Sequence, residues 1–299
     1  MRTPAFLVLF VALIAAVGWA YAATLAGAAA RWADDPQYSH GYLVPVFSLY
    51  LLYRRRALIR GVELRPSWLA LAPLAVAVSL RLVEARYFYN GLDQLSVAPA
   101  VLAAALAAGG RPAGRWVWPA ALFLIFMVPL PFRIQTAMSG ELQAVATRAS
   151  AFLLVTAGLP AVTEGNVIVL GDVRVGVVEA CSGLGMGVTF LALAAAYALV
   201  SPAARAVRLA VMLSALPIAV LANVARIAAT GLLFHLDRSE AARAVYHDLA
   251  GWLMIPLGCG MILFEAWFLG RIVAPVAPER GGPPVLEFPT PGPPAPRPA

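Results

Sequence analysis

The sequence predicts an all-α polytopic membrane protein of about eight transmembrane helices, with a short outward-facing amphipathic helix and a β-hairpin between helices five and six. Apolar runs near 20 residues recur along the chain, and this is about the length that a helix needs to cross a bilayer. Charged residues make up only 12% of the 299 residues, about half the share in a soluble domain. The arginines concentrate in short connections between the apolar runs.

The first half of the chain predicts five spans. Residues Ala5 to Ala30 form one apolar run. It is longer than the h-region of about 7–15 residues in a signal peptide, so a retained first helix is predicted. The second run, Gly41 to Tyr53, ends at three arginines and reaches spanning length by beginning near Tyr38. The next three spans are Trp68 to Val83, Leu92 to Ala108 and Trp116 to Leu130.

The pattern changes after the fifth span. Residues Ile134 to Leu159 mix polar and apolar side chains, which favours an interfacial amphipathic helix. In residues 162–178 the character of the side chains alternates on both sides of Gly171-Asp172. This pattern predicts a β-hairpin with a tight turn. The three remaining predicted spans are Leu184 to Val200, Ala206 to Leu233 and Ala250 to Val273. Residues 1–274 are therefore predicted to form one integral membrane domain, and the Pro- and Gly-rich residues 275–299 a disordered tail.

The arginines also predict the orientation. If the N-terminus lies inside and eight spans alternate, 13 of the 22 basic residues fall in inner segments and 11 of the 15 acidic residues fall outside. The positive-inside rule then places both termini in the cytoplasm. The net charge of +7 comes from arginine alone, and its distribution indicates topology rather than a nucleic-acid surface.

Three rare residues are predicted to reach the same outer surface. Cys181 lies at the outer end of the sixth span. Arg226 follows Arg205 by 21 residues, or about 31 Å along a helix, which is about one hydrocarbon thickness. His247 comes just before the eighth span, and Asn223 shares a helix face with Arg226. A thiol, a guanidinium and an imidazole are therefore expected together.

Each of these residues also has a structural interpretation. Cys181 can be a small packing residue at a helix start, Arg226 can extend to head groups, and His247 can be a solvated loop residue. His40 and His235 have the same structural interpretations, and Cys259 is expected to pack in the core. With two cysteines and no closely spaced histidines, neither a disulfide scaffold nor a metal site is predicted, and no cofactor is expected.

Four segments resemble a known family. Glu179-Ala180-Cys181-Ser182-Gly183-Leu184 resembles the Cys motif of the exosortase/archaeosortase family of membrane cysteine transpeptidases. Asn223-Val224-Ala225-Arg226-Ile227 is similar to its Arg motif, and His247-Asp248-Leu249-Ala250-Gly251-Trp252 to its His motif. Tyr38-Ser39-His40-Gly41-Tyr42-Leu43-Val44-Pro45 resembles its N-terminal half. The resemblance covers about residues 30 to 273.

The chain departs from the family at one position, because the residue after Cys-Ser-Gly-Leu, often Arg in the family, is Gly185 here. The resemblance implies a sortase-like enzyme of the bacterial inner membrane with an outward-facing site. Its substrates are exported proteins that end in a short motif such as Pro-Glu-Pro, one transmembrane helix and a basic tail. It implies Cys181 as the nucleophile, His247 as the acid and base, and Arg226 as the group that stabilises the oxyanion or holds the substrate.

Two other classes of function fit parts of the pattern. A transporter or channel could line a polar path with Arg226 and Asn223, although the spans lack pairs of charged residues at mid-depth. An outward-facing membrane glycan or acyl transferase would suit the long outer segment from Phe132 to Glu179. The reactivity of Cys181 distinguishes the cysteine enzyme from both.

Overall fold

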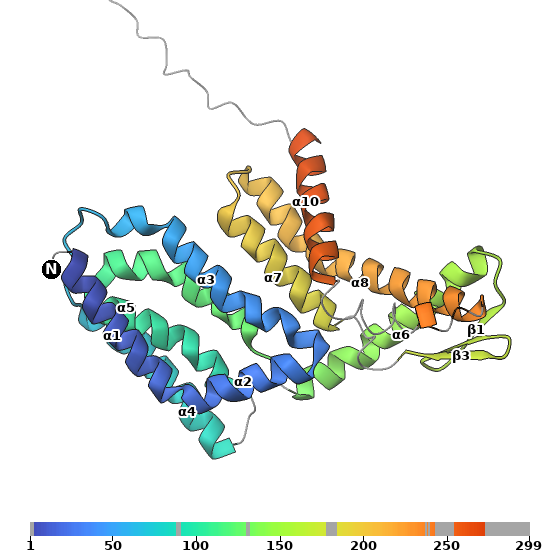
Figure 1. The fold of residues 1–299 in the computed structure, drawn as a ribbon, viewed down its shortest axis with the longest axis horizontal. Coiled ribbons are helices and arrows are strands. Elements are labelled where there is room, and N and C mark those ends of the chain that lie inside the picture. The colour runs from blue at the N-terminus through green and yellow to red at the C-terminus, as the bar shows by residue number, and fades with distance from the viewer. Residues whose placement is uncertain are drawn as a thin grey trace, which may run out of the picture.

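The computed structural model describes residues 3–87, 91–129, 132–177, 184–236, 238, 240–242 and 254–272 (Figure 1). These residues form a predominantly helical chain with one small sheet. The elements before the sheet are α1 (Thr3–Ala20), α2 (Ala22–Asp34), the 3-10 helix η1 (Pro36–Tyr42), α3 (Leu43–Arg54), η2 (Arg56–Ile59), η3 (Trp68–Ala70), α4 (Leu71–Tyr87), α5 (Leu92–Phe123), η4 (Leu124–Met127) and α6 (Phe132–Thr156). The others are β1 (Ala161–Glu164), β2 (Val167–Leu170), β3 (Val173–Gly176), α7 (Leu184–Val200), α8 (Arg205–His235) and α10 (Met254–Ile272). The predicted tail and two predicted site residues, Cys181 and His247, lie outside the described residues.

Fewer helices are long enough to span a membrane than the sequence predicts. Within the described residues, four are long and apolar enough: Trp68–Tyr87, Leu92–Met127, Arg205–His235 and Ile255–Ile272. If the bent pair formed by α1 and α2 is counted as one span, the number of candidate spans rises to five. The 17 residues of α7 form a shorter apolar helix, and the 12 residues of α3 rise only about 18 Å. The chain is thus a multi-helix membrane protein, and the predicted count of eight spans is not confirmed.

The first predicted span is bent rather than straight. Its two parts, Ala5–Ala20 and Ala22–Asp34, meet at an angle of 70°. Tyr21 lies at the bend, and its hydroxyl hydrogen-bonds Ser96 of α5 over 2.7 Å. Beside it, Arg81 of α4 pairs with Asp93 of α5 over 2.8 Å. Polar groups of two later helices therefore hold the bend, and no local feature of the first 30 residues indicates it.

One break divides α5 into two stretches. Gly110 has φ 66° and ψ −153° inside the helix, a backbone conformation that glycine adopts without steric cost. A Cβ at Gly114 would lie 2.6 Å from Cδ2 of Leu106. Residues eight apart in a straight helix are separated by about 12 Å, so the second stretch folds back on the first. The break lies between the spans predicted at 92–108 and 116–130, so the segment Leu92–Met127, which passes the length and composition test as one helix, consists of two stretches.

The segment between α5 and α7 contains a helix close to the predicted bounds and one more strand than predicted. The amphipathic helix is α6, with 25 residues. The predicted hairpin is part of a three-stranded antiparallel sheet in the order β1-β2-β3. Gly165 and Gly171 have positive φ in its two turns. Ile168 and Leu170 of the sheet share a buried cluster with Ile227 of α8, so the sheet packs on the helix that contains Arg226.

The arginine-bearing connections gather at one end of the molecule. Nη2 of Arg55, directly after α3, donates to the Arg115 carbonyl oxygen, just beyond the break in α5, over 3.0 Å. Arg54 lies in the same cavity wall as Ser201 and Pro202, which precede α8. The chain therefore brings together three of the connections that the sequence predicts on one side of the membrane.

Candidate functional site

Arg226 is buried in α8, with 4% of its surface exposed. Its Nη2 donates to Oδ1 of Asn223, one turn earlier, over 2.7 Å, and its backbone carbonyl accepts from the Thr230 hydroxyl over 2.9 Å. Towards Arg205 the buried positions of the same helix are apolar, for example Val211. A guanidinium so enclosed does not extend to head groups, so the interpretation of Arg226 as a surface anchor is wrong.

The neighbouring α6 supplies a buried polar face. Ser150 donates from its hydroxyl to the Val224 carbonyl oxygen of α8 over 3.2 Å. Further along α6, Oε1 of Gln143 accepts from the Asn166 amide over 2.8 Å. The Asn166 carbonyl oxygen in turn accepts from the backbone N–H of Val177 over 2.8 Å. This network holds the chain at Val177, four residues before Cys181.

The hydrophobic contacts bring the same region to α8. Val177, 3% exposed, belongs to the buried cluster that also contains Ile227 and Ala228. The strand that leads towards the predicted nucleophile therefore packs against the helical turn that carries Arg226. Of the three predicted catalytic residues, Arg226 is the one that the described residues place directly.

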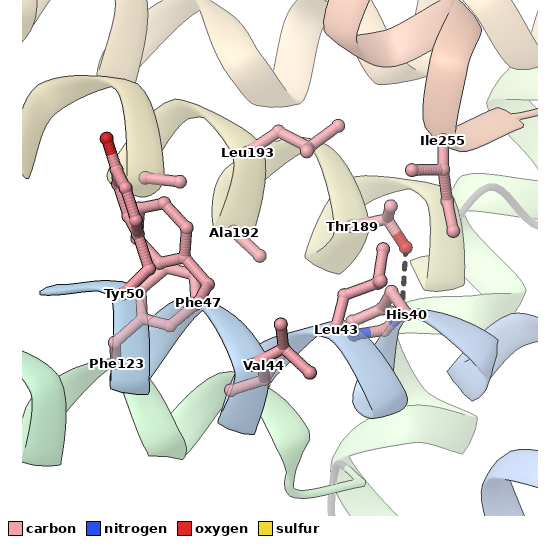
Figure 2. Close-up of a pocket in the computed structure, with 12 residues that line it drawn as sticks. His40, Leu43, Val44, Phe47, Tyr50, Phe123, Thr189, Ala192, Leu193 and Ile255 are labelled. Carbon is pink, nitrogen blue, oxygen red and sulfur yellow. Dashed lines mark hydrogen bonds between the residues drawn. The ribbon is translucent and has the colours of Figure 1, made fainter. Parts of the chain in front are cut away.

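The helix η1 packs against the first turns of α7, the element that follows the Cys motif in the sequence. Gly185, in the first turn of α7, is so close to Gln37 that a Cβ there would lie 2.7 Å from the Gln37 Cβ. One turn further, the Thr189 hydroxyl lies 3.0 Å from Nδ1 of His40. Nε2 of His40 lies 3.2 Å from the Phe126 carbonyl oxygen of η4. Figure 2 shows the contact between His40 and Thr189 as a dashed line.

Burial disfavours the charged form of His40. The residue is 5% exposed, and burial lowers the pKa of its imidazole below the ordinary value, because a charged ring loses its hydration. The backbone carbonyls of Phe126 and Gln37 act in the opposite direction. A carbonyl oxygen can only accept, so the neutral tautomer with the proton on Nε2 donates to Phe126 and leaves Nδ1 to accept from Thr189.

An apolar groove begins at this pair. Its first part has a volume of about 440 Å³, with His40, Thr189 and Ile255 at one end and Phe47, Tyr50 and Phe123 at the other (Figure 2). A second part of about 650 Å³ shares four lining residues with it and continues to Arg54 and Cys259. The residues common to both parts are Phe47, Tyr50, Leu193 and Ala196. We call the whole the α3–α7 groove; its walls suit hydrocarbon.

The remaining candidates lie away from these contacts. His235 is exposed at the C-terminal end of α8. Cys259 is a free thiol in the part of the chain that the structure describes, and it lines the α3–α7 groove rather than the core. The described residues contain no group of three His, Cys, Asp or Glu side chains that could hold a metal ion.

Sequence reasoning missed several polar residues of this region. Thr189 is a single hydroxyl in an apolar run, and it gives no local signal. Gln143 and Asn166 belong to segments described only as amphipathic or strand-like. His40 lies in a family-like segment, but its packing against α7 depends on a contact between residues 149 positions apart.

Comparison with known proteins identifies the family. The model of the transmembrane exosortase family (Exosortase_EpsH) matches residues 32–264, which is more than half of the chain and includes Cys181, Arg226 and His247. Searches of curated proteins and of solved structures gave no significant match. The segments that meet around Arg226 and at the start of α7 all lie within the matched region, and the chain belongs to the transmembrane exosortase family.

Proposed function

We propose that the protein is a membrane-embedded cysteine protease or transpeptidase that cleaves the C-terminal sorting signal of exported proteins. Cleavage takes place at the outer face of the cytoplasmic membrane, and Cys181, Arg226 and His247 are the catalytic residues. The observation that carries this proposal is the buried Arg226, oriented by Asn223, in a chain of the exosortase family.

The chemistry follows from the three side chains. Cys181 reacts as a thiolate with the scissile carbonyl carbon. His247 takes the thiol proton and returns a proton to the leaving amine when the C–N bond breaks. The product on the enzyme is a thioester, which an acceptor amine or water resolves while Cys181 regains its proton.

Arg226 stabilises the oxyanion of each tetrahedral intermediate. Its guanidinium lies in a buried environment, where a fixed positive charge acts more strongly than in water. Asn223 accepts a hydrogen bond from Nη2 and so restricts the rotation of the planar group. A pre-oriented donor does not need to reorganise during the reaction, and this favours the charged transition state over the neutral substrate.

The substrates are exported proteins with a C-terminal motif, one transmembrane helix and a basic tail. An N-terminus and a C-terminal tail in the cytoplasm agree with the arginine distribution, and the grouping of Arg54, Arg55 and Arg115 at one end supports the same orientation. The bilayer is the second partner, because candidate spans make up much of the described chain.

Trapping of the substrate tests the proposal. The probe is a reporter protein that ends in Pro-Glu-Pro, a transmembrane helix and a basic tail, co-expressed with full-length enzyme. With Cys181→Ala we expect full-length reporter to accumulate in the membrane. Cys181→Ser should be nearly as inactive, since a hydroxyl needs stronger activation than a thiol. His247→Ala should also be nearly inactive, because it removes the proposed acid and base. Cys259→Ala is the matched control and should process the reporter. If the Cys181→Ala enzyme, present at wild-type abundance, still removed the transmembrane helix from the reporter, a thiol nucleophile would be excluded.

A further inference from the structure

The 3-10 helix η1 is the meeting point of three later elements. The Tyr38 hydroxyl donates to Oε1 of Gln135 in α6 over 3.3 Å. His40 contacts η4 through Phe126 and α7 through Thr189. Of these elements, α7 directly follows the Cys motif, whereas η4 and α6 precede the sheet that leads towards it. A short segment near residue 40 is thus placed to influence chemistry that occurs about 140 positions later in the sequence.

Both ring nitrogens of His40 are engaged by the protein, although its ring lines one end of the α3–α7 groove. The side chain is 5% exposed, and both ring nitrogens lie within hydrogen-bond distance of protein atoms. A general acid or base needs one nitrogen free to reach the reacting atoms. His40 therefore acts through another residue, and that residue is Thr189.

The Thr189 hydroxyl has two possible acceptors and one proton. Its oxygen lies 2.9 Å from the Gly185 carbonyl oxygen and 3.0 Å from Nδ1 of His40. A threonine that donates to the carbonyl four residues earlier bends its helix. In this structure the hydroxyl donates to the Gly185 carbonyl oxygen, and Nδ1 of His40 is the second group that competes for the same proton. The imidazole thereby influences the direction of the first turn of α7.

Close packing makes this turn sensitive to η1. The absence of a side chain at Gly185 lets the Gln37 side chain pack directly on the first turn. Leu184 and Gly185 are buried, and Leu184 follows Cys181 by three residues. The glycine at the position where the family often has Arg is therefore required by the approach of η1 in this chain.

We propose that His40 is a positioning residue that, through its hydrogen bond to Thr189, sets the first turn of α7 and thereby the reactivity of Cys181. The inference rests on the proposed function for the identity of the nucleophile. It assigns a role to the Tyr38–Pro45 segment, which the catalytic steps leave without one.

Two substitutions of Thr189 distinguish the contribution of its hydroxyl group from that of its side-chain volume. Thr189→Val removes the hydroxyl at nearly constant volume, and Thr189→Ser keeps it. We expect Thr189→Val to lower kcat for the reporter about tenfold, the effect of one lost buried hydrogen bond, with KM unchanged and most activity retained by Thr189→Ser. The control is Ser48→Ala, which removes another buried hydroxyl contact, to the Ala120 carbonyl oxygen, and should leave kcat unchanged.

Substitutions of His40 identify the ring nitrogen that matters. The amide of His40→Asn lies near the position of Nδ1, whereas that of His40→Gln lies near the position of Nε2. We expect His40→Asn to retain more activity than His40→Gln, because it keeps a partner for Thr189. The double variant with His40→Gln and Thr189→Val should be no slower than the slower single variant, since both remove the same contact.

The rate of Cys181 alkylation by N-ethylmaleimide gives a readout that needs no substrate. In a Cys259→Ala background, Thr189→Val should change this rate at least threefold, and Ser48→Ala should not. Equal alkylation and equal kcat in Thr189→Val and Ser48→Ala would overturn the positioning role, as would a Thr189→Ser variant as slow as Thr189→Val. Processing of the reporter by Cys181→Ala would instead refute the proposed function, while the alkylation rates would still decide the role of His40.

Discussion

Segments α5 and α8 contain similar numbers of residues, 32 and 31, but α5 is two helical stretches joined at Gly110, and the two segments bury different chemistry. The buried positions of α5 are mostly Ala, Gly and Val, and the helix folds back at Gly110. The helix α8 continues to His235 and buries Asn223, Arg226 and Thr230 in its second half. The segment α5 provides close packing between backbones, and α8 encloses polar side chains inside the protein.

The two segments also differ in whether they bury a charged side chain. A buried guanidinium loses its hydration at a cost of several kcal/mol, which α5 avoids because Arg111 and Arg115 lie exposed beside its break. Such a cost inside a membrane protein is typical of functional residues. The comparison predicts that substitutions in α8 lower kcat, whereas substitutions in α5 lower stability.

The largest expected effect is on activity, at Arg226. Arg226→Lys keeps the charge but replaces a planar set of donors by a point charge on a flexible stem. We expect kcat for the reporter to fall about 100-fold or more, the range for loss of an oxyanion donor. Arg115→Lys in α5 is the matched control and should process normally. If the kcat of Arg226→Lys lies within threefold of this control, Arg226 is not a catalytic residue.

The second effect is on stability, at Gly110. An added Cβ would overlap the backbone carbonyl oxygen of Arg65, and the positive φ of Gly110 disfavours any L-residue. Gly110→Ala should therefore cost about 3 kcal/mol, visible as a lower thermal unfolding midpoint in detergent, with kcat per folded molecule unchanged.

The control for Gly110→Ala is Gly18→Ala in α1. No atom lies within 4 Å of its added Cβ, and Ala is favoured over Gly inside a helix by roughly 0.5–1 kcal/mol. This variant should be as stable as wild type or slightly more so. If both glycine variants unfold at the same temperature, the fold-back of α5 does not depend on Gly110.

The smallest expected effect is at Asn223. Asn223→Ala removes the acceptor that orients Nη2 of Arg226, and a hydrogen bond to a charged group contributes about 1.5 kcal/mol or more. We expect kcat to fall about tenfold at normal abundance. Ser96→Ala in α5 removes a buried contact to Tyr21 and should lower the unfolding midpoint instead. The comparison between the helices fails if the two variants exchange these effects.

Regular helices were predictable from the sequence because their signals are local. The apolar run predicted at Leu184 to Val200 is α7, and the run predicted at Ala206 to Leu233 lies within α8. The bend at Tyr21 was not predictable, because the groups that hold it come from α4 and α5. The first strand was missed because only the Gly171-Asp172 turn was recognised, although Gly165 makes a second turn.

The candidate site likewise combines features that local sequence indicates with features that depend on long-range contacts. The position of Arg226 along its helix followed from counting residues, but its burial depends on the packing of α8. The approach of Gln37 to Gly185 and the bond between His40 and Thr189 join segments far apart in the sequence. Periodicity describes one segment at a time, so contacts of this kind require the folded chain.

The length of α7 has a consequence for the surrounding lipid. Its 17 residues rise about 25 Å, about 5 Å less than the hydrocarbon core of a bilayer of about 30 Å. A helix shorter than the core is accommodated by local thinning of the bilayer. Head groups and water then come closer to the N-terminal end of α7, which begins three residues after Cys181. If the proposed function holds, we expect the rate in reconstituted membranes to depend on acyl-chain length.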